Sequence, residues 1–179
     1  MLAFLAFASV NAILLFSGSP GACTAGGGPI SVDAVHAVTF EQKWDAFAAT
    51  LDGGSPSRVI LSESEISSRA DTYLRDKTDH SFRDIRVCIH DGFGEVSGTV
   101  RLKGVELPVR IRGRLDFSGD HPVPKISGIQ VGKMPSFLTG FAAAFFEDAI
   151  EDGLRDDIHL SHPLASTLAE GDATISGRP

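Results

Sequence analysis

The feature that most constrains the fold is a change in the hydrophobic period, which begins at Phe82 and lasts to Val131. Over this stretch apolar and polar residues alternate, as they do in strands whose two faces meet different surroundings. Glycines separate the alternating runs and indicate turns. The expected strands occupy residues 82–92, 94–104, 106–119 and 125–134. The pattern predicts an antiparallel meander with one buried face.

Two helices are expected upstream, at residues 39–54 and 62–76, with a short strand at 57–61 between them. Each helix begins with a capping box, in which a hydroxyl side chain precedes a Glu or Gln by three residues. The two capping pairs are Thr39 with Gln42 and Ser62 with Glu65. Gly53 is expected to end the first helix, because glycine is the commonest residue just past a helix C-terminus.

A third helix, at residues 134–154, is the most apolar element that the pattern predicts. Its apolar surface is too broad for one narrow contact stripe, so it either completes the core or meets an apolar ligand. The candidate lipid contacts are Phe137, Leu138, Phe141, Phe145, Phe146 and Ile150. Two further strands are expected at residues 157–162 and 165–178.

The N-terminal region has the composition of an export signal. No side chain is charged before Asp33, and the apolar run at residues 2–16 is shorter than the span of about 20 residues that a membrane helix needs. We expect a signal peptide or lipoprotein leader at residues 1–22, a flexible Gly/Ser/Pro-rich tether at 23–37 and a single domain at 38–179. The expected location is the cell envelope or the exterior.

Cys23 is a candidate lipidation site. The string "SPGAC" ends in small residues before the cysteine, as a bacterial lipoprotein leader does, although Pro20 departs from the usual pattern. Ordinary signal cleavage after Ala25 is the alternative. Export also permits a disulfide between Cys23 and Cys88, and two cysteines alone do not decide among these fates.

The order of the elements resembles that of a known family. The strings "DGFGEVSGTVRL", "ISGIQVGKMPSFL" and "AEGDATISGR", within residues 58–178, are similar to those of the LmeA-type lipid-binding proteins of the bacterial cell envelope. More loosely, the chain resembles half of a TULIP (BPI-like) lipid carrier. The resemblance implies an α+β fold in which a strongly curved antiparallel meander sheet wraps around the long C-terminal helix. It also implies a hydrophobic groove for a phospholipid or another amphipathic lipid.

The charge distribution indicates a possible membrane contact. The chain carries a net charge of −7, which argues against generic nucleic-acid binding. Alternation nevertheless puts Arg110, Arg112 and Arg114 on one strand face, where they are candidates for contact with anionic lipid headgroups. The alternative is a solvated face with cross-strand ion pairs to Glu95 and Asp84.

Catalytic and cofactor signatures are not found in the sequence. The glycines at 26–28 lack the Lys-Ser/Thr of a phosphate loop, no G-x-S-x-G motif is present, and the histidines lack a recognisable metal spacing. We therefore expect no cofactor, no metal and no enzymatic activity. The sequence favours an exported envelope protein that binds lipid and the membrane surface. The alternative is an envelope structural or protein-interaction module with a filled core.

Overall fold

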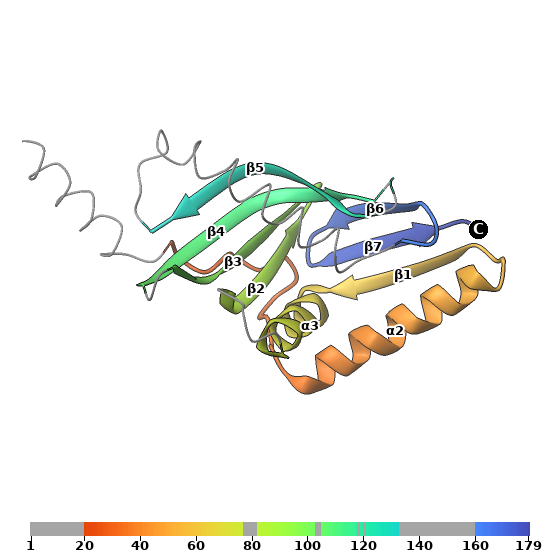
Figure 1. The fold of residues 1–179 in the computed structure, drawn as a ribbon, viewed down its shortest axis with the longest axis horizontal. Coiled ribbons are helices and arrows are strands. Elements are labelled where there is room, and N and C mark those ends of the chain that lie inside the picture. Colours follow the sequence, from red (N-terminus) through yellow and green to blue (C-terminus); the bar gives the residue numbers. More distant parts are fainter. Residues whose placement is uncertain (1–19, 77–81, 103–104, 118, 120, 133–159) are drawn as a thin grey trace, which may run out of the picture.

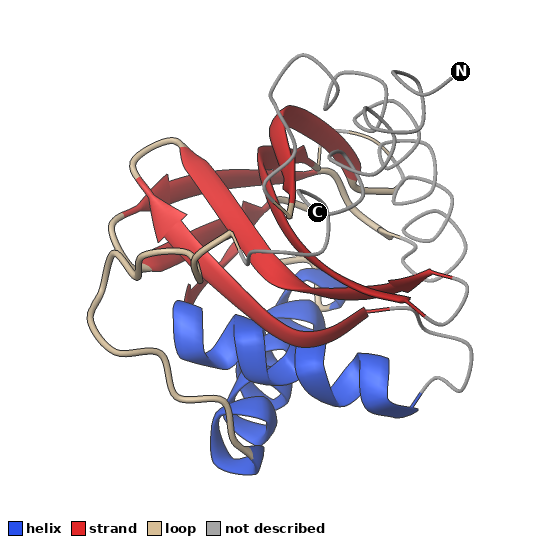
Figure 2. Ribbon diagram, turned by 90° about the vertical axis from the view of Figure 1, so that its left-hand side faces the viewer, coloured by secondary structure: helices blue, strands red, loops and turns tan. Residues whose placement is uncertain are grey.

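A computed structural model of the chain describes residues 20–76, 82–102, 105–117, 119, 121–132 and 160–179 (Figure 1). These residues form two helices and seven strands. The strands make two antiparallel sheets, one of three strands in the order β1-β7-β6 and one of four strands in the order β2-β3-β4-β5. Figure 2 shows the two helices together on one side of the strands.

Helix α2 (Ala34–Asp52) begins five residues before the predicted start. Asp33 is the N-cap, and its Oδ1 accepts a hydrogen bond of 2.9 Å from the His36 N–H. Thr39, the predicted cap, lies inside the helix, where its hydroxyl donates to the Val35 carbonyl at 2.9 Å. Asp and Thr are both favourable N-cap residues, so the sequence pattern alone could not decide between Asp33 and Thr39. Gly53 follows the last helical residue, as predicted.

Helix α3 (Glu63–Asp76) confirms the predicted capping box. The Glu65 N–H donates to Ser62 Oγ at 3.3 Å, and the Ser62 N–H donates to Glu65 Oε2 at 2.9 Å. Lys43 Nζ from α2 lies 2.7 Å from Glu65 Oε1. Burial raises the pKa of Glu65, but the hydrogen bonds and charge of Lys43, with the Ser62 N–H, outweigh it and hold that pKa below its ordinary value.

The three-stranded sheet joins the two ends of the domain. Strand β1 (Ser57–Ser62), predicted at 57–61, pairs with β7 (Asp172–Gly177), and β7 pairs with β6 (Leu164–Ala169). Residues 160–162 are not a strand. The segment predicted as one strand at 165–178 instead contains β7 and all of β6 except its first residue, Leu164. One hydrophobic cluster packs between this sheet and α2. It contains Phe47, Leu51, Val59, Leu61, Leu164 and Ile175.

The four-stranded sheet confirms the predicted meander. Its strands are β2 (Phe82–His90), β3 (Phe93–Leu102), β4 (Val105–Asp116) and β5 (Val123–Val131), each antiparallel to its neighbour. A second cluster lies on its apolar face and contains Val100, Val109, Ile129 and Val131. The sheets meet where the Leu164 N–H donates to the Phe117 carbonyl and the Gly92 N–H donates to the Leu168 carbonyl, each at 3.1 Å.

The predicted α+β class is confirmed, but the architecture implied by the family resemblance is wrong. The described strands form two sheets, not one curved meander, and the longest described helix is α2, with 19 residues near the N-terminus. The helix expected at 134–154 lies outside the described residues. The error has a physical source, because alternation shows which face of a strand is buried but not which strand is its partner. Here β1 pairs with β7, more than 100 positions later in the chain.

Candidate functional site

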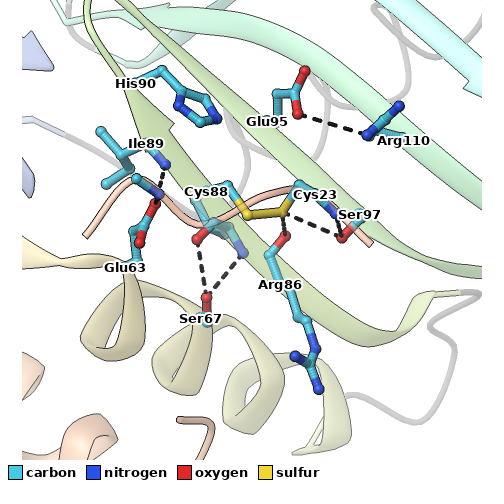
Figure 3. The surroundings of a disulfide bond; sticks show 12 residues. Cys23, Glu63, Ser67, Arg86, Cys88, Ile89, His90, Glu95, Ser97 and Arg110 are labelled. Atoms are coloured by element: carbon cyan, nitrogen blue, oxygen red, sulfur yellow. Dashed lines mark hydrogen bonds and ion pairs between the residues drawn. A yellow bond between two sulfur atoms is a disulfide. The ribbon is translucent and has the colours of Figure 1, made fainter. Parts of the chain in front are cut away.

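Two surfaces of the four-stranded sheet carry the groups of interest. The first lies along the edge strand β2. A disulfide holds residues 20–29, which we call the N-terminal segment, against this strand. Cys23 is bonded to Cys88 of β2, with a sequence separation of 65 and a Cα–Cα distance of 6.0 Å (Figure 3). Cys88 is fully buried, Cys23 is 8% exposed, and the Cys23 N–H donates to Ser97 Oγ of β3 at 3.3 Å.

Glu63 is a second attachment point for the N-terminal segment. Its carboxylate accepts from the N–H groups of Gly26, Gly27 and Ile89, at 2.8, 3.1 and 2.6 Å. Glu63 is 4% exposed and lies in the first turn of α3, where the helix dipole favours a negative charge. Gly26 and Gly27 fall within the predicted tether at 23–37, and the structure holds them against the domain through these bonds.

Close backbone packing explains the glycines of this segment. A Cβ on Gly27 would lie 2.9 Å from the Cα of Gly171, in the β6–β7 turn, and Gly171 has a φ of +83°. Only a residue without a side chain fits such an approach, and glycine adopts positive φ without steric cost. The sequence showed these glycines as a cluster, but their partner lies more than 140 residues away.

Helix α3 also supplies hydrogen-bond partners to the backbone of the edge strand β2. The Val87 N–H donates to Ser67 Oγ at 2.9 Å, and the Ser67 hydroxyl lies 3.3 Å from the Val87 carbonyl (Figure 3). Together with Glu63, Ser67 gives side-chain partners to backbone groups that an open edge strand would expose. Ser67 is fully buried, so this contact is part of the core.

The disulfide bears on the proposed fates of Cys23. A lipidated cysteine carries a thioether on its sulfur, whereas the sulfur of Cys23 is bonded to Cys88 in the structure. The two states are therefore mutually exclusive in one molecule. The disulfide that the sequence only permitted is present, and lipidation of Cys23 stays a prediction for the reduced chain.

The second surface is the outer face of β3, β4 and β5, which we call the basic face. Arg110 lies in register with Ser97, Arg112 with Glu95, and Arg114 with Lys125. Residues in register across antiparallel strands project to the same side of a sheet, so the three arginines share one face, as alternation predicted. The basic face contains five cations, Arg101, Arg110, Arg112, Arg114 and Lys125, and three carboxylates, Glu95, Glu106 and Asp116.

Glu95 and Glu106 neutralise one part of the basic face. Arg101 Nη2 lies 2.6 Å from Glu106 Oε1, and Arg110 Nη1 lies 4.0 Å from Glu95 Oε2. Arg110 also donates to the side-chain oxygen of Gln130 at 3.0 Å. The predicted pairing of arginine with Glu95 is thus present. These contacts leave excess positive charge toward the other end of β4.

At that end Arg112 is stacked and Arg114 and Lys125 are exposed. The Arg112 guanidinium lies 3.6 Å from the centre of the Phe93 ring, a cation–π contact that fixes its plane. Within the described part of the chain, neither Arg114 nor Lys125 has a carboxylate partner. Beside them is an open depression of about 410 Å³. It is lined by Gly92, Phe93, Gly113, Arg114, Lys125, Ile126 and Ser127.

The candidate lipid contacts on the third helix lie outside the described residues. They are Phe137, Leu138, Phe141, Phe145, Phe146 and Ile150. Across the described ranges, no helix is long and apolar enough to cross a membrane. The same ranges contain no group of three metal-ligating side chains.

Comparison with known proteins identifies no relative of this chain. No protein-family model matches the chain, and neither the curated proteins nor the solved structures include a match. The function must therefore be argued from the residues and their geometry.

Proposed function

We propose that this chain is an exported, non-catalytic protein that binds anionic phospholipid membranes through the basic face. The observation that carries the proposal is the gathering of five cations on one sheet face of a chain whose net charge is −7. On this face the cations outnumber the carboxylates by five to three, whereas over the whole chain the acidic residues outnumber Lys and Arg by seven. Charge of this sign and placement suits a surface of anionic headgroups.

The magnitude of the attraction is sufficient for reversible binding. A Lys or Arg close to an anionic membrane contributes about 1 kcal/mol, and the attraction declines within a Debye length. The contributions of Arg112, Arg114 and Lys125 are not reduced by ion pairs with Glu95 or Glu106, which pair with Arg110 and Arg101. Binding of this kind is sensitive to salt and to the fraction of anionic lipid.

Export is supported by two independent features. The uncharged N-terminal region has the pattern of a secretory leader. A disulfide such as Cys23–Cys88 is typical of proteins in oxidising compartments, because cysteine thiols in the cytosol are kept reduced. The acyl-chain contacts expected between Phe137 and Ile150 remain a prediction from the sequence.

The proposal is tested by sedimentation of the protein with vesicles. We expect binding to phosphatidylglycerol vesicles and little binding to phosphatidylcholine vesicles. The triple variant Arg110→Gln/Arg112→Gln/Arg114→Gln should bind at least about 30-fold more weakly, at about 1 kcal/mol for each of Arg112 and Arg114, with a smaller contribution from Arg110 because it is paired with Glu95. The matched control is Arg58→Gln on the other sheet, where the guanidinium donates to Thr174 Oγ1 at 3.4 Å.

Two results would contradict the proposal. One is equal binding of the wild-type protein to both kinds of vesicle. The other is unchanged binding of the triple variant, provided that its circular dichroism spectrum matches that of the wild type. Absence of any vesicle binding would instead favour the envelope protein-interaction module.

A further inference from the structure

The geometry points to a phosphate-binding subsite in the depression between Phe93 and Lys125, with Arg114 and Lys125 as its two cationic ligands. This inference deepens the proposed function and rests on it, because it names a particular group that the basic face would hold. The ligand chemistry is a phosphate group, supplied either by a lipid headgroup or by free phosphate.

The first argument is the pairing of two like charges. Arg114 and Lys125 lie directly in register on β4 and β5, both are exposed, and neither has a carboxylate partner among the described residues. Like charges directly opposite each other on a sheet are destabilising. An anion between them removes that repulsion and gains two charge-assisted contacts. Asp116, two positions after Arg114 on β4, projects from the same face and lies in register with Val123, so the three residues together keep a net positive charge.

The second argument is the shape of the strand next to this pair. The pairing of β4 and β5 shifts between Arg112 and Gly113, and the Ser127 hydroxyl lies 3.2 Å from the Arg112 carbonyl at this irregularity. Bulges of this kind redirect side chains and often lie beside functional sites. Gly113 lines the depression, and a Cβ there would lie 2.6 Å from the Lys125 carbonyl oxygen, so glycine permits the close approach of β4 and β5 at this irregularity.

The third argument is the fixed position of the neighbouring guanidinium. Arg112 is stacked on Phe93, which itself lines the depression. Stacking occupies one face of the guanidinium and leaves its N–H edges for an acceptor, the geometry that suits phosphate oxygens. The His90 ring packs against the same Phe93 ring at an interplanar angle of 32°, with 4.9 Å between ring centres, and further restrains it.

The test is a titration of the disulfide-bonded full chain with inorganic phosphate, with sodium chloride at equal ionic strength as the reference. Amide shifts of Gly92 and Gly113 in NMR spectra are the readout. We expect saturable shifts with phosphate only. Arg114→Gln and Lys125→Gln should each weaken phosphate binding by about fivefold. Arg101→Gln is the matched control, since it removes the same charge from the same face but is paired with Glu106.

Vesicle binding distinguishes a lipid headgroup from free phosphate as the source of the phosphate group. It also distinguishes failure of the subsite from failure of the proposed membrane function. If inorganic phosphate competes with phosphatidylglycerol vesicles and Arg114→Gln weakens both, the subsite holds a lipid headgroup. If phosphate binds saturably but vesicles do not, the subsite stands for free phosphate and the proposed membrane function fails. If vesicles bind, phosphate produces no saturable shift, and Arg101→Gln weakens binding as much as Arg114→Gln, the subsite is overturned while the membrane function stands.

Discussion

The Cys23–Cys88 disulfide gives the sharpest prediction about stability. It joins residues 65 positions apart, and Cys88 is fully buried. Reduction opens this bond and changes no other covalent bond of the chain. The main effect is therefore to release the unfolded chain from a long closed loop, which makes unfolding more favourable.

The magnitude follows from the length of that loop. In the chain-entropy treatment, a closed loop of about 65 residues raises the free energy of unfolding by about 4 kcal/mol at 25 °C. Urea slopes for small domains are about 2 kcal/mol/M, so reduction should lower the urea midpoint by about 2 M. The bonds from Glu63 to Gly26 and Gly27 persist in the reduced protein, so the domain is expected to fold with the segment still attached.

The assay is urea denaturation with and without dithiothreitol, followed by tryptophan fluorescence from Trp44. The double variant Cys23→Ala/Cys88→Ala is the control and should not respond to dithiothreitol. A midpoint shift below about 0.5 M in the wild type would refute the reasoning, because the cross-link would then contribute about 1 kcal/mol or less. A response of the double variant would show that the reagent acts elsewhere.

Three further predictions concern the attachment of the N-terminal segment and the helix pair. Glu63→Ala leaves three backbone N–H groups without their acceptor and should cost about 3 kcal/mol in urea denaturation, whereas the exposed Glu170→Ala should cost under about 1 kcal/mol. Gly171→Ala, at a φ of +83°, should lower the free energy of unfolding by at least about 1 kcal/mol in thermal denaturation. Lys43→Met should destabilise the protein by about 1 kcal/mol at neutral pH, and this difference should shrink as pH falls below 4.5, the ordinary pKa of Glu65.

The pH prediction has a definite sign. Because the folded-state pKa of Glu65 is lowered, its ionised form stabilises the fold above pH 4.5, and that contribution is lost as the pH falls through the folded-state value. A Lys43→Met difference that stays constant down to pH 3 would contradict this. Equal losses for Glu63→Ala and Glu170→Ala, or a neutral Gly171→Ala, would contradict the packing described for the segment.

Local features of the fold were predictable from the sequence. The capping box at Ser62 and Glu65 places the start of α3, because both of its hydrogen bonds are made by residues three positions apart. The meander from β2 to β5 was predictable for a similar reason, since each strand pairs with its neighbour in the chain. The shared face of Arg110, Arg112 and Arg114 followed from the two-residue period of a strand.

Contacts between distant residues could not be predicted in this way. The pairing of β1 with β7 and the approach of Gly27 to Gly171 depend on chain ends that meet only in the folded domain. Glu63 looked like an ordinary acidic residue in the first turn of a helix. Its three backbone partners come from two other segments, and no local pattern marks them.

The depression of the basic face was missed for a related reason. Arg114 appeared in the sequence as one of three alternating arginines, but the partner that makes it distinctive, Lys125, lies on the next strand. The register that brings them together includes an irregularity at Arg112 and Gly113. A one-residue shift in pairing moves a side chain to the other face of a sheet, so this juxtaposition needed the structure.

The most direct test of the central claim is the salt dependence of binding to phosphatidylglycerol vesicles. Between about 0.01 M and 1 M salt the Debye length falls from about 30 Å to about 3 Å, which screens the basic face from the headgroups. The account predicts that binding by the wild-type protein is strong at the lower concentration and lost at the higher one. Binding that is unchanged across this range would contradict the account.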